Sequence, residues 1–238
     1  MQIEPQKLYL IPVSLDEDAA ITKTLPNDVI DIVKNLTHFI VENEKTARAF
    51  LKKVGIITAQ KDLTILVYNK KDKLPLSHYF KLFDESKSIG LMSEAGCPGV
   101  ADPGAEIIRE AHKRNIEVVP FVGPSSILLA LMAAGFNGQQ FTFVGYLPID
   151  KADRLKRIKD LEMVSEKYNI TQLFIETPFR NNHLFDDIVK TCKPNTSLSI
   201  GVDITGKNQT LKTMSIAEWR NNKPELHKRP AVFVLYGR

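Results

Sequence analysis

The sequence predicts an α/β protein with two domains, an open parallel sheet over residues 1–122 and a mixed sheet over residues 123–238. Two observations lead to this prediction. Apolar runs of strand length alternate five times with helical segments before residue 122, and this alternation is typical of a parallel sheet. Beyond Gly123, strand-like runs follow each other with short connections, which indicates a mixed sheet.

The first domain is expected to begin with a strand at Leu8–Pro12, which leads into an acidic loop at Val13–Asp18. The helix that follows, Pro26–Leu36, has apolar residues at helical spacing on one side. The next elements continue the alternation. They are a strand at His38–Val41, a helix that ends at Val54 before Gly55, a strand at Thr64–Tyr68, a helix at Leu76–Phe83, a strand at Ile89–Met92, a helix that ends at Arg114 and a strand at Glu117–Val122.

The stretch Ile89–Gly145 holds eight of the twelve glycines and contains the two most informative turns. In the first turn, the loop Ser93–Asp102 follows a strand that is expected to be buried. We expect Asp102 to cap the next helix and Pro103 to be its first residue. Asn115 suits the left-handed conformation at the end of that helix.

The second turn, Gly123–Pro124, ends a strand, and Ser125 and Ser126 can cap the helix that follows. That helix, residues 125–134, is apolar on every side and is therefore expected to be buried. Two successive strand–loop–helix units imply parallel strands, so both loops lie at carboxyl strand ends, where open α/β sheets bind ligands. A small-molecule site is the preferred interpretation, and two tight turns without a ligand are the alternative.

The second domain is expected to alternate less regularly. Its elements are a strand at Phe141–Gly145, a helix at Arg154–Tyr168, a strand at Thr171–Glu176, a helix at Asn182–Cys192, strands at Ser197–Ile204 and Leu211–Ile216, a short helix at Ala217–Asn222 and a strand at Ala231–Tyr236. Glu176 and Asp203 each stand at a strand end, where a carboxylate can accept hydrogen bonds from a ligand or simply face water. The segment Lys151–Lys167 mixes both charges, and a solvated helix face is favoured there over a nucleic-acid contact.

Composition and motifs exclude several classes of protein. The formal net charge of +4 permits an RNA partner without requiring one. Cys97 and Cys192 lack CxxC spacing and the five histidines are scattered, so we expect a reducing compartment and no metal site. No apolar run approaches the roughly 20 residues of a membrane span, and the start of the chain is too polar for a signal peptide. A cytoplasmic protein without a membrane partner is expected.

Common nucleotide-binding and nucleophile motifs are absent. No GxGxxG follows a strand and no GxxxxGK(S/T) occurs, so neither a Rossmann dinucleotide site nor a P-loop is predicted. The segment Gly123–Ile127 is not a nucleophile elbow, because Ile127 replaces the final glycine. Ser125 is expected to cap a helix or to bond a ligand.

Several longer motifs point to a known group of enzymes. They are LYLIP at residues 8–12, SEAGCPGVADPG at 93–104, VVPFVGPSS at 118–126, ALMAAGF at 130–136, FVGYLP at 143–148 and LFIETPFR at 173–180. With these motifs the chain resembles the tetrapyrrole-methylase superfamily of methyltransferases that use S-adenosylmethionine (SAM). Within it, the chain is most similar to the branch that methylates a cytidine ribose of small-subunit ribosomal RNA at the 2′-oxygen. The resemblance covers nearly the whole chain.

The resemblance implies two α/β domains with SAM in a cleft between them, and a homodimer. Carried over residue by residue, it also implies a set of cofactor-binding positions. They are Gly96, Cys97, Pro98 and Val100 on one loop, Ser125 and Ser126 on the next, Leu173 and Ile175 in the second domain, and Ala231 in the last strand.

Three carboxylates are candidates for catalysis. If the acceptor is a ribose hydroxyl, a base within hydrogen-bond reach would help the transfer. Glu176, Asp203 and Glu42 are the candidates for that base. Two other interpretations of the chain remain open. The first is methylation of a tetrapyrrole, and the second is a non-catalytic nucleotide- or RNA-binding protein that kept the SAM cleft.

Some positions depart from the branch, and they bear on the acceptor. Val202 stands where the branch has arginine, Glu44 stands where it has threonine, and the first loop brings in Asp16–Asp18. Each change makes the expected entrance to the site less positive, and phosphate contacts depend on positive charge. We therefore expect an acceptor that differs from the usual ribosomal cytidine or is bound differently. The alternative is that Lys45, Lys207 and Lys212 restore the lost charge from nearby positions.

Overall fold

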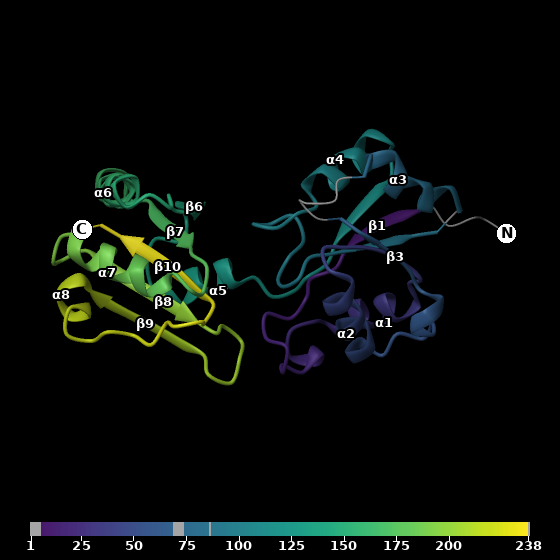
Figure 1. The fold of residues 1–238 in the computed structure, drawn as a ribbon, viewed down its shortest axis with the longest axis horizontal. Helices are drawn as coiled ribbons and strands as arrows, with labels where there is room; N and C mark the ends of the chain where they lie inside the picture. The colour runs from purple at the N-terminus through teal and green to yellow at the C-terminus, as the bar shows by residue number, and fades with distance from the viewer. Residues whose placement is uncertain (1–5, 69–73, 86, 238) are drawn as a thin grey trace. The chain divides into compact units, whose positions relative to one another are not determined.

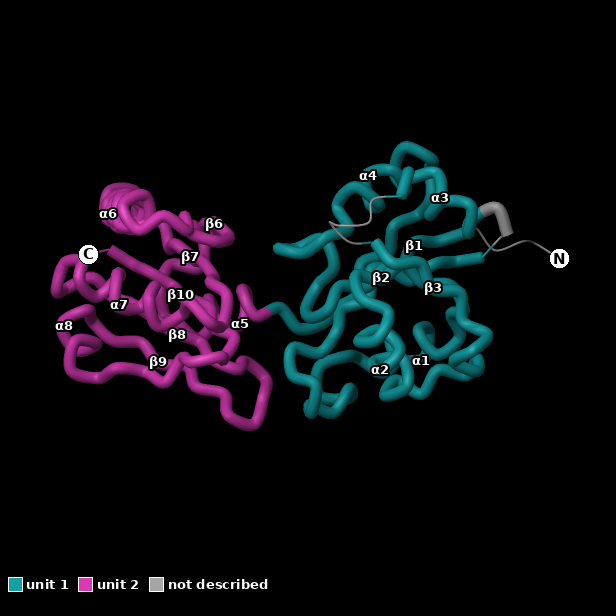
Figure 2. Tube along the Cα trace, viewed as in Figure 1, with its two compact units in different colours: residues 1–125 teal, residues 126–238 magenta. Residues whose placement is uncertain are grey.

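The chain forms two compact units, residues 1–125 and residues 126–238 (Figure 2). The computed structural model describes residues 6–68, 74–85 and 87–237. Each unit contains a five-stranded sheet with its own helices and its own hydrophobic core. One sheet is parallel and the other is mixed, so the predicted α/β fold class is confirmed.

The sheet of the first unit is parallel throughout, with the strand order β3–β2–β4–β1–β5. Its strands are β1 (Lys7–Leu10), β2 (His38–Val41), β3 (Thr64–Val67), β4 (Ile89–Met92) and β5 (Glu117–Pro120). Every strand expected in this domain is present, within two residues of its expected ends. β2 and β4 are buried along their whole length, and such strands are continuous apolar runs, which is why the sequence pattern located these two so closely.

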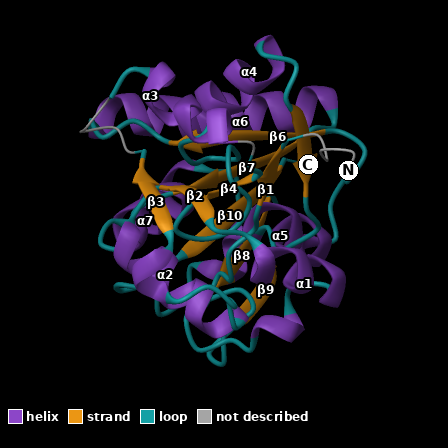
Figure 3. Ribbon diagram, turned by 90° about the vertical axis from the view of Figure 1, so that its right-hand side faces the viewer, coloured by secondary structure: helices purple, strands orange, loops and turns teal. Residues whose placement is uncertain are grey.

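Helices cover both faces of this first sheet (Figures 1 and 3). On one face lie α1 (Asn27–Asn35) and α2 (Glu44–Val54), and on the other lie α3 (Leu76–Phe80) and α4 (Ala105–Lys113). Phe39 and Val41 of β2 pack in the first of these two layers, and Ile40 packs in the second. Three short 3-10 helices, at Ile21–Lys23, Gln60–Asp62 and Lys81–Glu85, join these elements.

The start of α4 differs from the sequence-based prediction. The helix begins at Ala105, and Gly104 occupies the N-cap position with a φ of 129°, which side-chain-bearing residues rarely adopt. Asp102 and Pro103 lie in the preceding turn, so their predicted roles as N-cap and first helical residue are wrong. The backbone of Gly104 can adopt this positive φ, and this lets the chain turn once more before the helix starts. Asn115 does take the left-handed conformation, with a φ of 55°.

The sheet of the second unit is mixed, with the strand order β6–β7–β10–β8–β9. Its strands are β6 (Phe141–Tyr146), β7 (Thr171–Ile175), β8 (Ser197–Val202), β9 (Thr210–Ser215) and β10 (Ala231–Tyr236). Only β6 and β7 run parallel. Ile175 pairs with Val232, and Ala231 pairs with Val202. The carboxyl ends of β7 and β8 therefore share one edge of the sheet with the amino end of β10.

Helices cover both faces of this second sheet. α6 (Lys151–Tyr168), α7 (Asn181–Thr191) and α8 (Ile216–Trp219) pack against Phe174 and Phe233, while α5 (Ser126–Ala134) contacts β8, β9 and β10. The prediction that α5 is buried holds for one side of the helix, with Ile127, Ala130, Leu131 and Ala134. Its Leu128 and Met132 are 51% and 79% exposed, because only one side of the helix faces the sheet.

Candidate functional site

The carboxyl ends of the parallel strands lie together at one edge of the first sheet, and most predicted site residues of this unit lie in the loops that leave them. These loops begin at Ile11 after β1, Glu42 after β2, Ser93 after β4 and Phe121 after β5. Open α/β sheets bind ligands at this edge. The contacts between the loops decide what the edge can hold.

The loops after β1 and β4 are joined by two reciprocal backbone hydrogen bonds. The N–H of Val13 donates to the carbonyl of Gly96 at 2.8 Å, and the N–H of Gly96 donates to the carbonyl of Val13 at 2.8 Å. Gly96 has a φ of 73°, which glycine adopts without strain. A Cβ at this position would lie 3.5 Å from Cδ2 of Leu15 and 3.8 Å from the carbonyl oxygen of Pro124. The loops after β1, β4 and β5 therefore meet at Gly96.

Cys97 ties the same loop to the one after β5. Its Sγ donates to the carbonyl of Pro124 at 3.4 Å. Burial raises the pKa of the Cys97 thiol, and the charge of Asp102 adds to the increase, so the thiol stays protonated. A protonated thiol is a poor nucleophile, and Cys97 is better suited to holding the loops together. Pro98 continues this loop, and Val100 is 49% exposed.

The loop after β5 comes still closer to the loop after β1 at Gly123. A Cβ there would lie 2.2 Å from the Cβ of Pro12 and 3.1 Å from Cδ2 of Leu25. There is no room for a side chain, so the approach of the two loops requires glycine. Ser125 ends the first unit, and Ser126 is the first residue of α5.

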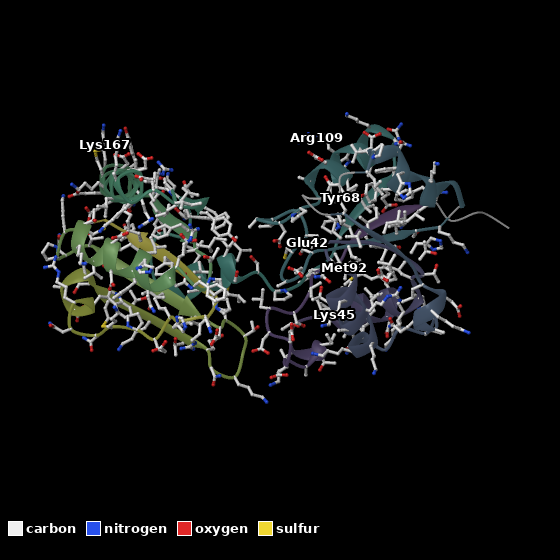
Figure 4. The ribbon with its side chains drawn as sticks, in the orientation of Figure 1. Glu42, Lys45, Tyr68, Met92, Arg109 and Lys167 are labelled. Carbon is white, nitrogen blue, oxygen red and sulfur yellow. The ribbon has the colours of Figure 1, made fainter. Side chains whose placement is uncertain are left out.

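Glu42 is the predicted catalytic carboxylate that lies in this loop cluster. Its backbone N–H donates to the carbonyl of Met92 at 3.2 Å, and its Oε2 accepts from the N–H of Glu94 at 3.3 Å. Figure 4 shows Glu42 and Met92 next to each other in the first unit. Glu42 is thus held against the start of the loop that contains Gly96.

A tyrosine–carboxylate pair that the sequence did not predict lies at the same edge. Tyr68 follows β3, and its hydroxyl donates to Oε2 of Glu106 on α4 at 2.5 Å. Burial, the hydrogen bond to Glu106 and the charge of that carboxylate raise the pKa of Tyr68 to about 12. Tyr68 therefore stays a neutral donor and fixes the end of β3 to α4. The two residues are far apart in the sequence and belong to none of the motifs, so the sequence did not indicate the pair.

In the second unit the predicted cofactor residues divide between the two faces of the sheet. Leu173 and Ile175 lie on the face opposite Phe174, whereas Ala231 packs with Phe174 in the core formed by α6, α7 and α8. Leu173 has no exposed surface, and Ala231 is 7% exposed. A ligand on one face of this sheet would contact the side chains of only one of these groups.

Glu176 and Asp203 lie at the shared edge of the second sheet, and an arginine holds each of them. Oε1 of Glu176 accepts from Nη2 of Arg180 at 2.6 Å. Oδ2 of Asp203 accepts from Nε of Arg229 at 2.7 Å. Their side chains are 1% and 19% exposed, so neither is a loop carboxylate that simply faces water.

A cavity of about 160 Å³ lies beside Glu176 in the second unit. It is lined by Ile149, Arg154, Glu176, Arg180, His183 and Leu184. The sequence could not reveal it, because its polar residues come from α6, from the loop after β7 and from α7.

Over the described residues, no three or more histidine, cysteine, aspartate or glutamate side chains are grouped to hold a metal ion. In the same part of the chain, no helix has the length and apolar character needed to cross a membrane.

Comparison with known proteins relates this chain to a group of enzymes. It is 26% identical over 209 residues to a ribosomal RNA small subunit methyltransferase I of Leptospira biflexa, covering 87% of this chain and 82% of the relative. The protein of the same name from Vibrio cholerae is 25% identical over 236 residues, covering 97% of this chain and 77% of the relative. No family model matches the chain.

The chain is a relative of these methyltransferases. The crystal structure of the methyltransferase CobJ has the same fold, with a TM-score of 0.61 over 98% of this chain and all of that one, at 16% identity. The predicted resemblance and the predicted enzyme class, a methyltransferase, are confirmed. Because the relatives are named as enzymes, they give no support to the alternative of a non-catalytic binding protein.

The close approach of two loops at Gly123 gives a prediction for this methyltransferase. Gly123→Ala forces a Cβ to within 2.2 Å of Pro12, so the loops must separate. We expect a loss of about 1–3 kcal/mol of stability, measured as a lower midpoint of urea unfolding. Gly138→Ala is the control, because a Cβ there meets nothing within 4 Å. Equal midpoints for the two variants would contradict the account of this contact.

Proposed function

We propose that the protein transfers a methyl group from SAM to the 2′-oxygen of a ribose in RNA, and that SAM binds at the loop cluster of the first unit. The observation that carries the proposal is the meeting of three loops at Gly96, in a chain whose relatives are named ribosomal RNA methyltransferases. A Cβ at position 96 would fill the point where these loops meet, so the absence of a side chain suits a ligand that lies against their backbone.

For this reaction the protein must align the two reacting groups and provide a proton acceptor. When bound, SAM supplies an electrophilic methyl group on a sulfonium. The ribose oxygen forms a bond to the methyl carbon as the carbon–sulfur bond breaks, and the hydroxyl proton must leave. Alignment of the two reacting atoms supplies much of the rate in such a displacement.

We assign the proton-accepting role to Glu42. Its carboxylate accepts a hydrogen bond from the backbone of the loop that contains Gly96, in the unit to which we assign SAM. Glu176 and Asp203 are each bonded to an arginine. A carboxylate fixed by a guanidinium is better suited to accepting hydrogen bonds from a ligand than to moving a proton.

The assignment of RNA as acceptor draws on the names of the relatives. The loop after β1 carries Asp16, Glu17 and Asp18, and the last two are exposed. Val202, at the position where the branch has arginine, is only 2% exposed and packs in the second core. Neither feature offers a cation to RNA phosphates, so we propose that this chain binds its acceptor differently from the ribosomal enzymes.

We propose further that the protein works in the cytoplasm as a homodimer. The resemblance suggests the dimer, and the exposed Leu128 and Met132 of α5 offer apolar surface for one. Light scattering at micromolar concentration is expected to give about twice the chain mass of 26.8 kDa. A mass of one chain across that range would contradict the proposal.

A pair of glycines tests the SAM site. Gly96 and Gly135 have φ values of 73° and 72°, so an alanine at either one is strained by about 1–2 kcal/mol. Gly96→Ala places its Cβ at the meeting point of the loops, whereas a Cβ at Gly135 meets nothing within 4 Å. We expect both variants to lose similar stability, but only Gly96→Ala to lose at least tenfold in SAM affinity by calorimetry. Equal SAM affinities would exclude this loop from the site.

A complementation experiment tests the acceptor. The gene is expressed in cells that lack the small-subunit ribosomal RNA methyltransferase I, and methylation of the cytidine ribose is measured. We expect little or no restoration, together with SAM binding by the purified protein. Full restoration of the methyl group would show that the chain uses the same acceptor as its relatives.

A further inference from the structure

We propose that the cavity beside Glu176 binds a pyrimidine base of the RNA acceptor, with Glu176 and Arg180 contacting the polar edge of the base. The proposal rests on the RNA methyltransferase function given above. It adds a recognition site that lies wholly within the second unit.

Glu176 uses only one of its two carboxylate oxygens inside the protein. Oε1 accepts from Nη2 of Arg180 and from the N–H of Thr177, both at 2.6 Å. No residue in the described part of the chain donates to Oε2, although the side chain is only 1% exposed. Glu176 lines the cavity, so its Oε2 is an acceptor that a ligand in the cavity can use.

Arg180 supplies a donor beside that acceptor. Its Nε donates to Oγ1 of Thr177 at 3.3 Å and its Nη2 donates to Glu176, while Nη1 has no acceptor among the described residues. A guanidinium carries five N–H donors in a fixed plane, so Arg180 keeps unused donors at the cavity. The polar edges of bases place a donor and an acceptor next to each other, which is the complementary pattern.

The size of the cavity matches a single ring. A protein cavity of about 150 Å³ binds benzene, and this cavity has a volume of about 160 Å³. One six-membered ring fits such a space, whereas the fused rings of a purine are larger. Ile149 and Leu184 offer apolar surface to the faces of the ring.

The charges favour a neutral base over a phosphate. Arg154 is neutralised by Asp187, with Nε 2.8 Å from Oδ2, and this pair is nearly buried. Arg180 is neutralised in the same way by Glu176. A phosphate would need an uncompensated cation, and neither arginine of the cavity offers one.

Two segments that adjoin lining residues of the cavity carry exposed aromatic side chains. Phe179, which is 69% exposed, precedes Arg180 in the loop after β7. Tyr146, which is 58% exposed, ends β6 and pairs with Ile175 at the end of β7. Bases of single-stranded RNA stack on such side chains, so nucleotides beside the bound pyrimidine have a surface to stack on.

Binding of two labelled RNA hexamers, oligocytidylate and oligoadenylate, tests the proposal. Both carry the same phosphates, and fluorescence anisotropy at fixed salt measures the ratio of their affinities. We expect the wild-type protein to prefer oligocytidylate by about tenfold. Glu176→Gln should reduce the preference at least threefold without changing the salt dependence. Phe179→Ala should weaken the binding of both hexamers, because every base can stack on an aromatic ring. Phe179 is largely exposed, so its replacement does not threaten folding.

Glu166→Gln is the matched control, because it removes a carboxylate that pairs with Lys193 and does not line the cavity. It should keep the full preference. A preference that survives unchanged in Glu176→Gln, or no preference in the wild-type protein, overturns the base pocket and leaves the methyltransferase proposal intact. If the wild-type protein binds neither hexamer, the RNA acceptor and the base pocket both fail.

Discussion

The reciprocal hydrogen bonds between Val13 and Gly96 hold the candidate site of the first unit together. Loops that leave parallel strands point away from the sheet and have no ladder to pair with, so something else must join them. Here the two bonds join the loops after β1 and β4, and the lack of a side chain at Gly123 lets the loop after β5 come against Pro12. Backbone groups of three loops therefore converge at one edge of the sheet.

The strands and the glycine-bearing loops could be predicted from the sequence because their physics is local. The apolar run His38–Val41 must be a strand buried on both faces, and the glycines of residues 89–145 mark places where the backbone turns or approaches closely. The start of α4 could not be predicted, since Asp102 and Gly104 both suit the end of a turn and only the three-dimensional path decides between them. The exposure of Leu128 and Met132 could not be predicted either, because α5 is apolar on every side and its composition does not show which side faces the sheet.

The features that could not be predicted from the sequence are contacts between side chains that are far apart in the chain. The bond of Tyr68 to Glu106 and the ion pair of Arg154 with Asp187 join residues more than thirty positions apart. The second unit fixes its carboxylates with arginines, whereas the site of the first unit is built mainly from backbone groups. We infer that the two units make different contributions, with cofactor binding in the first and acceptor recognition in the second.

Hydrogen exchange with and without SAM tests the central claim, which is that the loop cluster of the first unit binds the cofactor. Amides in bound backbone exchange more slowly than those in mobile loops. Saturating SAM is predicted to slow exchange in segments 11–16, 93–104 and 121–126 together, because the three loops share their contacts at Gly96 and Gly123. Saturating SAM without slower exchange in any of these segments would contradict the account.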